Sequence, residues 1–168
     1  MKILQIAIVL ISCCAASVMG QAPKYPQPIL APEAHVFGYA VDRDDKQMVI
    51  NYIFQEAQEF DERYGLAIVK FNGHYGVINP GGSFVIDPIY EDISLNPDYG
   101  TYTVRVNGKC GVVTHNGDII HAIKYDNIGA TTDGWYEGEL DGTWLYFAPA
   151  GRVTDSMSKY LEWKSAGK

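Results

Sequence analysis

The sequence predicts an all-β protein. Antiparallel hairpins or meanders stack as repeats into an open, solenoid-like twisted sheet, and a short C-terminal helix caps it. The first observation is that Asn-Gly or Asp-Gly pairs recur between apolar runs, at Asn72, Asn107 and Asp141. Such pairs are strong signals for two-residue hairpin turns. The second is a content of 17 glycines and 12 tyrosines, which favours turns and strands.

The N-terminal segment, residues 1–20, resembles a secretory signal peptide. Lys2 gives it a positive start, residues 3–11 are almost wholly apolar, and small residues follow. Cleavage between Gly20 and Gln21 predicts a protein that is secreted, periplasmic or part of the cell envelope.

A second interpretation of the same segment competes. Residues 10–13 resemble a bacterial lipobox, in which Cys13 is lipidated and becomes the first residue of an envelope lipoprotein. An uncleaved anchor, or no export, is the third interpretation. Because Cys13 and Cys14 lie in this segment, a cut after Gly20 leaves Cys110 as the single mature cysteine and excludes an intramolecular disulfide.

Residues 21–34 are rich in proline, with Pro23, Pro26, Pro28 and Pro32. This spacing favours an extended, polyproline-like tether and disfavours helix and sheet. We therefore expect a linker ahead of the repeat domain.

From residue 35 to residue 153 the chain repeats itself about three and a half times. Residues 72–78 align with residues 107–113, an offset of 35. The alignment continues at the same offset, with residues 90–93 matching residues 125–128.

Two further copies are less complete. Residues 141–147 align with residues 107–113 at an offset of 34, and this copy breaks off soon after residue 153. At the other end, Tyr39 aligns with Tyr75 and Met48 with Phe84, both at an offset of 36. This first copy lacks the Asn-Gly pair.

Each unit predicts a three-stranded meander. The first hairpin of a unit joins residues 66–71 to 74–79, or 101–106 to 109–114, which are rich in β-branched and aromatic residues. A second glycine then permits a reversal into a short strand such as residues 83–86. Such a unit cannot bury its apolar face alone, so neighbouring units must stack. The second-turn glycines are Gly82, Gly117 and Gly151.

The repeat resembles that of the WG-repeat family, whose units read as a Gly-Lys-Trp-Gly turn and strand, a Gly-containing turn and a Tyr-Asp-x-Ile stretch. Here the signature reads Gly-His-Tyr-Gly at residues 73–76, Gly-Lys-Cys-Gly at residues 108–111 and Gly-Thr-Trp-Leu at residues 142–145. The Trp-Gly pair is never intact. The resemblance implies an exported or intracellular repeat module, without a common reaction.

The C-terminal segment, residues 154–168, is expected to cap the open end of the stack with a helix over residues 154–164. Met157, Tyr160 and Leu161 fall on one helical face. Residues 55–63, in the first copy, are expected to form a helical turn.

Few side chains in the chain suggest catalysis or metal binding. Cys110 occupies the repeat slot of Tyr39, Tyr75 and Trp144, which favours a buried thiol that packs as a small hydrophobe. The histidines show no paired-ligand spacing and are expected to be exposed turn residues. They are His35, His74, His115 and His121. Residues 42–45, Asp-Arg-Asp-Asp, resemble part of a calcium-binding loop, but they lack the glycine and the later bidentate glutamate of such a loop. A solvated hairpin turn is the favoured interpretation.

Two acidic pairs recur with the repeat, at residues 91–92 and 126–127. Because they recur, we interpret them as architectural, with hydrogen bonds to turn amides. A glycosidase would require two carboxylates in one cleft at a defined separation.

Some aromatic residues lie outside the slots of the repeat: Tyr99, Tyr102, Trp135, Tyr136 and Trp163. Packing in the core or cap is one interpretation, and a sugar- or protein-binding surface is the other. Among them Tyr99, Tyr102, Trp135 and Tyr136 are the candidate binding residues. Trp135 and Tyr136 are the preferred pair, because adjacent strand residues face opposite sides and one should point outward.

The formal net charge of −7 disfavours nucleic acid and anionic membranes as partners, since both require a basic surface. We expect no cofactor, no metal ion and no membrane contact unless Cys13 is lipidated. The leading hypothesis is an exported, non-catalytic module that binds or scaffolds an unidentified protein or glycan. The alternatives are an envelope lipoprotein with a structural or accessory role and a hydrolase with an acidic cleft. The oligomeric state stays open.

Overall fold

The computed structural model describes residues 24–31, 33–41, 47–131, 134–149 and 151–166. The expected signal peptide, Cys13 and residues 42–45 lie outside this set. The described residues form four antiparallel sheets and one helix. The first sheet contains β1 (Gln27–Ala31), β2 (Val36–Ala40) and β3 (Met48–Phe54). The second contains β4 (Glu56–Ala57), β5 (Ala67–Phe71), β6 (His74–Ile78) and β7 (Phe84–Tyr90).

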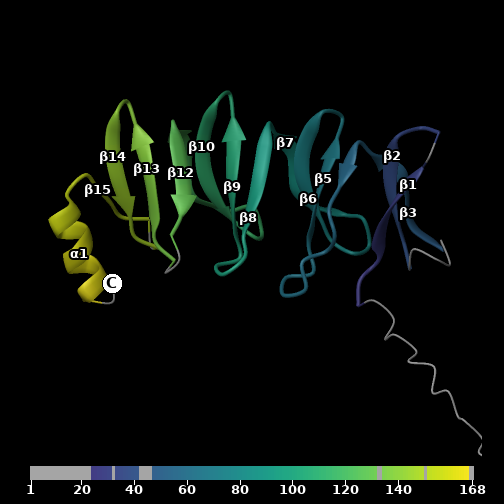
Figure 1. Cartoon of the computed structure of the whole chain (residues 1–168), viewed down its shortest axis with the longest axis horizontal. Helices are drawn as coiled ribbons and strands as arrows, with labels where there is room; N and C mark the ends of the chain where they lie inside the picture. The colour runs from purple at the N-terminus through teal and green to yellow at the C-terminus, as the bar shows by residue number, and fades with distance from the viewer. Residues whose placement is uncertain (1–23, 32, 42–46, 132–133, 150, 167–168) are drawn as a thin grey trace, which may run out of the picture.

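The two C-terminal sheets have the same order of strands as the second. The third sheet contains β8 (Asp92–Asn96), β9 (Thr101–Val106), β10 (Lys109–Thr114) and β11 (Ile119–Tyr125). The fourth contains β12 (Asn127–Ala130), β13 (Tyr136–Leu140), β14 (Thr143–Phe147) and β15 (Val153–Thr154), and α1 (Met157–Ser165) follows it. Figure 1 shows the sheets in chain order along the long axis, with α1 at one end.

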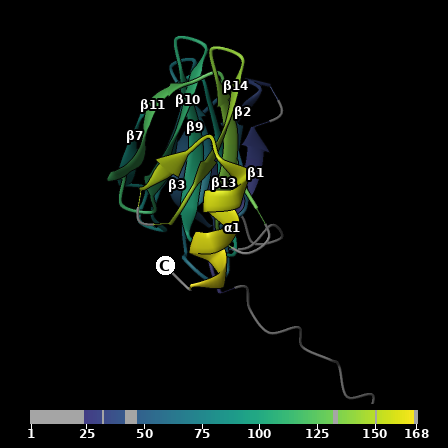
Figure 2. The ribbon, with the colours of Figure 1, turned by 90° about the vertical axis from the view of Figure 1, so that its left-hand side faces the viewer.

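The sheets stack on one another, as the view along the stack from the α1 side shows (Figure 2). One apolar cluster fills each junction. The first joins Tyr39 and Phe54 to Val69 and Ile78, between the first and second sheets. The all-β, open repeat architecture expected from the sequence is confirmed, although the sheet is divided into four.

The clusters at the other junctions have the same character. Between the second and third sheets they include Val77, Ile86, Tyr102 and Val104. Between the third and fourth they include Val112, Tyr125, Ile128, Tyr136 and Phe147. The last cluster joins Trp135, Tyr146 and Ala148 to Tyr160 of α1. Both faces of the inner sheets are therefore buried.

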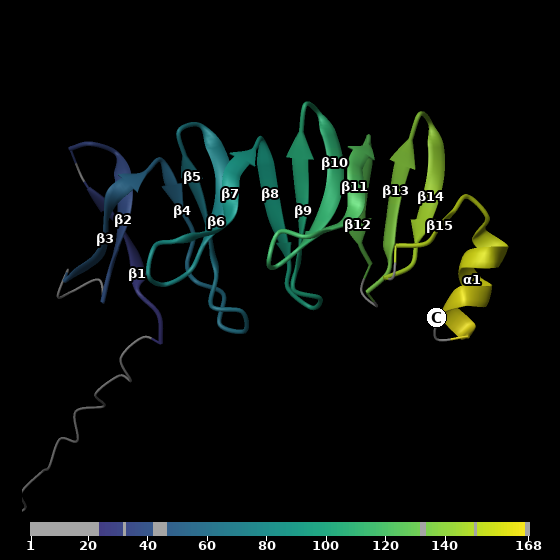
Figure 3. The same cartoon turned by 180° about the vertical axis from the view of Figure 1, so that it is seen from behind.

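The Asn-Gly and Asp-Gly pairs form the three expected hairpin turns. Asn72, Asn107 and Asp141 have φ of 50°, 49° and 51°, and the glycine after each is also at positive φ. A type I′ turn requires this at both central positions. All three hairpins lie at the same edge of the stack (Figures 1 and 3).

The unit has four strands where three were expected. The short strand expected at residues 83–86 extends to Tyr90 as β7. After a bend at Glu91 or Asp126, the chain continues as the first strand of the next sheet, β8 or β12. Each repeat therefore passes directly into the following sheet.

The alignment of the first copy requires a correction. Phe37 pairs with Phe54 as Tyr75 pairs with Tyr90, and Gly38 is crowded by strand β3 as Gly76 is by β7. The true offset in this strand is thus 38, although Met48 does match Phe84 at 36. The β2–β3 connection is two residues longer, which shifted the alignment based on Tyr39.

Part of the expected linker is a strand. Gln27–Ala31 forms β1 and pairs along its length with β2. Pro28 is tolerated because β1 is the edge strand of its sheet, and an edge strand has one side without ladder partners.

The expected helical turn at residues 55–63 is wrong at its start, where Glu56–Ala57 is strand β4. The C-terminal helix is confirmed as α1. Its N-cap, Ser156, accepts a hydrogen bond from the backbone of Lys159. Tyr160 is its buried residue, whereas Met157 and Leu161 are exposed. No helix within the described residues has the length and apolar character needed to cross a membrane.

Candidate functional site

Both residues of the preferred pair, Trp135 and Tyr136, are buried. Trp135 is 7% exposed and Tyr136 is 2% exposed. Tyr136 packs between the third and fourth sheets, and Trp135 packs edge-on against Tyr160 of α1, with ring centroids 5.3 Å apart. The expectation that one of them points outward is wrong, because the stack covers one face of the sheet and α1 covers the other.

The other two candidates have different surroundings. Tyr102 is 1% exposed, in the core between the second and third sheets, and therefore cannot meet a ligand. Tyr99 is partly exposed, in the loop between β8 and β9. The structure brings Tyr99 and Tyr136 together at one hollow and places Trp135 and Tyr102 elsewhere.

The Tyr99 ring is fixed by the turns on both sides of the junction. Its loop closes with hydrogen bonds from the backbone N–H groups of Tyr99 and Gly100 to the carbonyl of Asn96, both 3.1 Å. The ring then lies over Gly134 of the next sheet, where a Cβ atom would come within 2.8 Å of it. A residue with no side chain, at φ 84°, is what allows this approach.

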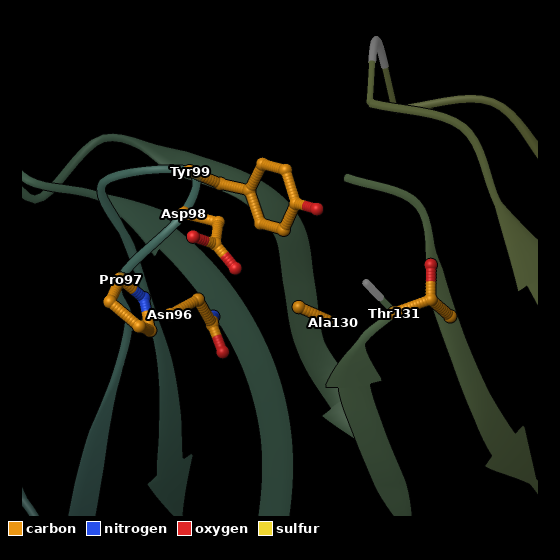
Figure 4. A pocket seen from close by; sticks show the side chains of 6 residues that line it. All are labelled: Asn96, Pro97, Asp98, Tyr99, Ala130 and Thr131. Carbon is orange, nitrogen blue, oxygen red and sulfur yellow. The ribbon is translucent and has the colours of Figure 1, made fainter. Parts of the chain in front are cut away.

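A smaller hollow of about 160 Å³ lies on one side of Tyr99. Figure 4 shows the ring reaching from its loop toward Thr131, with the Asp98 carboxylate and the Asn96 amide beside the space. Pro97 and Ala130 complete the lining. Among the described residues, this lining is therefore largely polar and includes one carboxylate, Asp98.

A larger hollow of about 390 Å³ lies between the third and fourth sheets and also includes Tyr99 in its lining. Its lining is completed by Thr101, Ile120, Gly134, Tyr136 and Pro149. The Thr101 and Tyr136 hydroxyls are hydrogen-bonded at 2.8 Å. Burial raises the pKa of Tyr136, so its hydroxyl stays protonated. We call the two hollows together the Tyr99 site.

The volume of the larger hollow is within the range of small-ligand sites, at its lower end. Its walls combine aromatic and aliphatic surface with two hydroxyls. A sequence signal for the site was present, since Tyr99 lay outside the repeat slots. The hollow itself depends on a contact between sheets and could not be located from the sequence.

The recurring acidic residues hold turns, as expected. The Glu91 carboxylate accepts hydrogen bonds from the backbone N–H groups of Asn107 and Gly108, at 2.8 and 3.0 Å. The Asp126 carboxylate accepts one from Asp141 N–H at 2.8 Å and pairs with Lys109. These carboxylates therefore join one repeat to the hairpin of the next.

Cys110 is a buried thiol, 2% exposed, and burial raises its pKa. Both properties oppose nucleophilic use. Its slot is not a uniform packing position, however, because Trp144 in the fourth sheet is 47% exposed. The helix α1 covers Tyr146, two residues further along β14, and leaves Trp144 open.

The prediction for His121 is also wrong. It was expected to be exposed, but it is 2% exposed in β11, between the rings of Tyr136 and Phe147 at 5.0 Å from each. Its Nε2 atom has no hydrogen-bond partner. Burial lowers the pKa of His121 to about 4, so the ring is neutral near pH 7.

A third hollow, of about 150 Å³, has two carboxylates in its lining, more than either of the other two hollows described here. Its lining includes Glu59, Glu62 and Tyr25. Both glutamates are exposed, whereas a catalytic acid requires an apolar environment that raises its pKa. Within the described part of the chain, no group of three or more His, Cys, Asp or Glu residues could hold a metal ion.

Comparison with known proteins identifies the repeat. Residues 40–74 and 75–110 each match the family model described as WG containing repeat. No curated protein and no solved structure matches the chain. The structure extends the repeat beyond the matched residues, since the third and fourth sheets have the same order of strands as the second.

Proposed function

Because the chain carries WG repeats, we propose that it is a non-catalytic binding or scaffold module that works outside the cytoplasm and binds its ligand at the Tyr99 site. The observation that carries the proposal is the Tyr99 ring, which lines both hollows, precedes Gly100 and packs over Gly134. A rigid aromatic ring flanked by space is a common anchor for binding.

Three features support this proposal over a catalytic one. The buried thiol of Cys110 and the buried ring of His121 do not line the Tyr99 site, although His121 packs behind Tyr136. The recurring carboxylates are engaged by turn amides. Among the residues that the structure describes, Asp98 is the single carboxylate in the lining of the Tyr99 site. The placement outside the cytoplasm rests on the signal-like residues 1–20.

The proposal is tested by capture on the immobilised chain, residues 21–168, from an envelope extract of the producing cell. Tyr99→Ala should abolish retention of the protein or glycan that the wild-type chain retains. Tyr52→Ala is the matched control, because Tyr52 is an exposed tyrosine on the first sheet. Equal retention by the wild-type chain and by Tyr99→Ala would show that the Tyr99 site is not the binding site.

A further inference from the structure

The Tyr99 junction has an internal counterpart one repeat earlier. Tyr64, in the loop before β5, lies over Gly100 as Tyr99 lies over Gly134; a Cβ atom at either glycine would come within 2.6 or 2.8 Å of the ring. Two residues after Gly100, Tyr102 pairs with Val113. Two residues after Gly134, Tyr136 pairs with Phe147, which is the same register one repeat later. The two junctions can therefore be compared position by position.

The two junctions differ in what faces the tyrosine. His115 stacks on Tyr64, with ring centroids 6.0 Å apart and planes at 22°. The equivalent of His115 is Pro149, because the turns that contain them close alike: Thr114 N–H bonds to the Asp118 carbonyl, and Ala148 N–H bonds to the Arg152 carbonyl. Pro149 lines the larger hollow beside Tyr99. The protein thus stacks an exposed ring of its own on one tyrosine and has a proline beside an open hollow at the other.

We propose that the larger hollow takes up an aromatic or imidazole side chain of a protein partner, which lies on Tyr99 as His115 lies on Tyr64. The inference rests on the proposed function, and it specifies the chemical class of the ligand. Ile120 and Pro149 supply apolar walls for such a ring. Thr101 and Tyr136 supply hydroxyls for its polar atom.

The charge beside the site specifies the flanking residue of the partner. In the earlier junction Arg63 precedes the tyrosine and donates a hydrogen bond to the Pro97 carbonyl, at 3.0 Å. Asp98 stands in the position of Arg63, and its carboxylate lines the smaller hollow (Figure 4). Since the whole chain has a net charge of −7, a basic residue next to the partner's ring meets a complementary surface.

A pyranose ring could also stack on Tyr99, but the hollow favours a side chain. Its walls are mainly aliphatic and aromatic, and the lining includes two hydroxyls. A sugar carries a hydroxyl on nearly every ring carbon, and each unsatisfied one costs free energy on burial. The stacked His115 shows that a planar side chain fits the equivalent slot.

The test uses ¹⁵N-labelled residues 21–168 and three blocked peptides: Gly-Lys-Tyr-Lys-Gly, Gly-Lys-Leu-Lys-Gly and Gly-Glu-Tyr-Glu-Gly. The lysine–tyrosine peptide should shift the amide resonances of Thr101 and Gly134. The other two should bind at least about fivefold more weakly. The leucine peptide lacks the ring that stacks on Tyr99, and the glutamate peptide lacks the basic residues that pair with Asp98.

Two reciprocal variants examine the slot itself. Pro149→His should place the protein's own ring on Tyr99 and weaken peptide binding at least about fivefold. His115→Pro should open the slot at Tyr64, and because Arg63 replaces Asp98 there, the glutamate–tyrosine peptide should add shifts at Gly100. Proline is compatible with this turn position, since Pro80 and Pro149 occupy it in the neighbouring units. His115→Ala provides the same test if the proline variant unfolds.

Several results would overturn the inference. One is equal binding of the leucine and tyrosine peptides, and another is unchanged binding by Pro149→His. A third is a shift of Gly134 by the tetramer of N-acetylglucosamine but not by the peptides, which would make the ligand a glycan. Retention from the extract that depends on Tyr99, without peptide binding, would reject this inference and leave the proposed function standing.

Discussion

The Glu91 carboxylate closes the hairpin turn at Asn107: its Oε1 atom accepts a hydrogen bond from Asn107 N–H at 2.8 Å. The other oxygen accepts one from Gly108 N–H at 3.0 Å. Glu91 belongs to the bend that joins the second sheet to the third. These two hydrogen bonds therefore connect the β9–β10 hairpin turn of the third sheet to the bend through which the chain enters that sheet.

We expect Glu91→Ala to lower the free energy of unfolding by about 1–3 kcal/mol, since two charge-assisted hydrogen bonds are lost. The measurement is urea denaturation followed by tryptophan fluorescence. Asp87→Ala is the control, because Asp87 is an exposed carboxylate in the neighbouring strand β7. Equal effects of the two substitutions would show that the turn contacts contribute nothing.

His121 should make the protein less stable in mild acid. The pKa of His121 is lowered from 6.5 to about 4 by burial. The unfolded chain therefore takes up the proton first, so stability is full above about pH 6.5 and falls as the pH drops toward 4. Between pH 7 and pH 5 the loss is on the order of 2 kcal/mol.

His121→Ile should remove this loss. Ile50 and Ile86 occupy the same register position in the first and second sheets, so the side chain suits the site. The free energy of unfolding of both proteins is measured at pH 7 and pH 5. A wild-type loss no larger than that of the variant would contradict the assignment.

Gly134→Ala should destabilise the chain for two reasons, the positive φ of 84° and the Tyr99 ring above it. The backbone term is roughly 1–2 kcal/mol. Gly142→Ala isolates it, because Gly142 has φ 76° and nothing within 4 Å of a Cβ atom. The excess cost of Gly134→Ala should disappear in a Tyr99→Ala background, as a double-mutant cycle in urea would show. An undiminished excess would place the steric conflict elsewhere.

Cys110 should resist thiol reagents in the folded protein, because it is buried and burial raises its pKa. Labelling with a chromogenic disulfide is expected to be slow in buffer and rapid in denaturing urea. Rapid labelling of the folded chain would require Cys110 to be accessible in a way the structure does not provide.

The mature N-terminus should begin at Gln21 if the signal-like segment is cut after Gly20. Intact-mass spectrometry of the protein isolated from its producing cell measures this directly. A lipid-modified Cys13 would instead establish the lipoprotein alternative, and a mass that includes Met1 would reject both.

The features that local chemistry dictates were predictable from the sequence. The hairpin turns follow from adjacent Asn-Gly residues, and β9 and β10 have the expected bounds, Thr101–Val106 and Lys109–Thr114. The role of Glu91 and Asp126 followed from their recurrence with the repeat. Each of these depends on residues close together in one unit.

Most of the errors concern contacts between units, and two concern strand pairing within a sheet, at β1 and β4. Trp135 is buried because α1 covers it, and His121 is buried because the fourth sheet covers it. The alternation of side chains along a strand does not predict which helix or sheet will pack on either face. Strand β1 escaped prediction because its prolines favour a tether, and only its pairing with β2 makes it part of a sheet. The Tyr99 site likewise depends on two sheets.

The exposed Trp144 has a consequence for the assembly of such proteins. Where another sheet follows, the slot is buried at Cys110 and half-buried at Tyr75, whereas α1 leaves it open at Trp144. A four-stranded unit inserted ahead of α1 would therefore meet a face already shaped to receive it. Under the proposed binding mode, an added junction accepts a ring only when the position of His115 and Pro149 leaves its slot open, so that residue sets the valency together with the number of units.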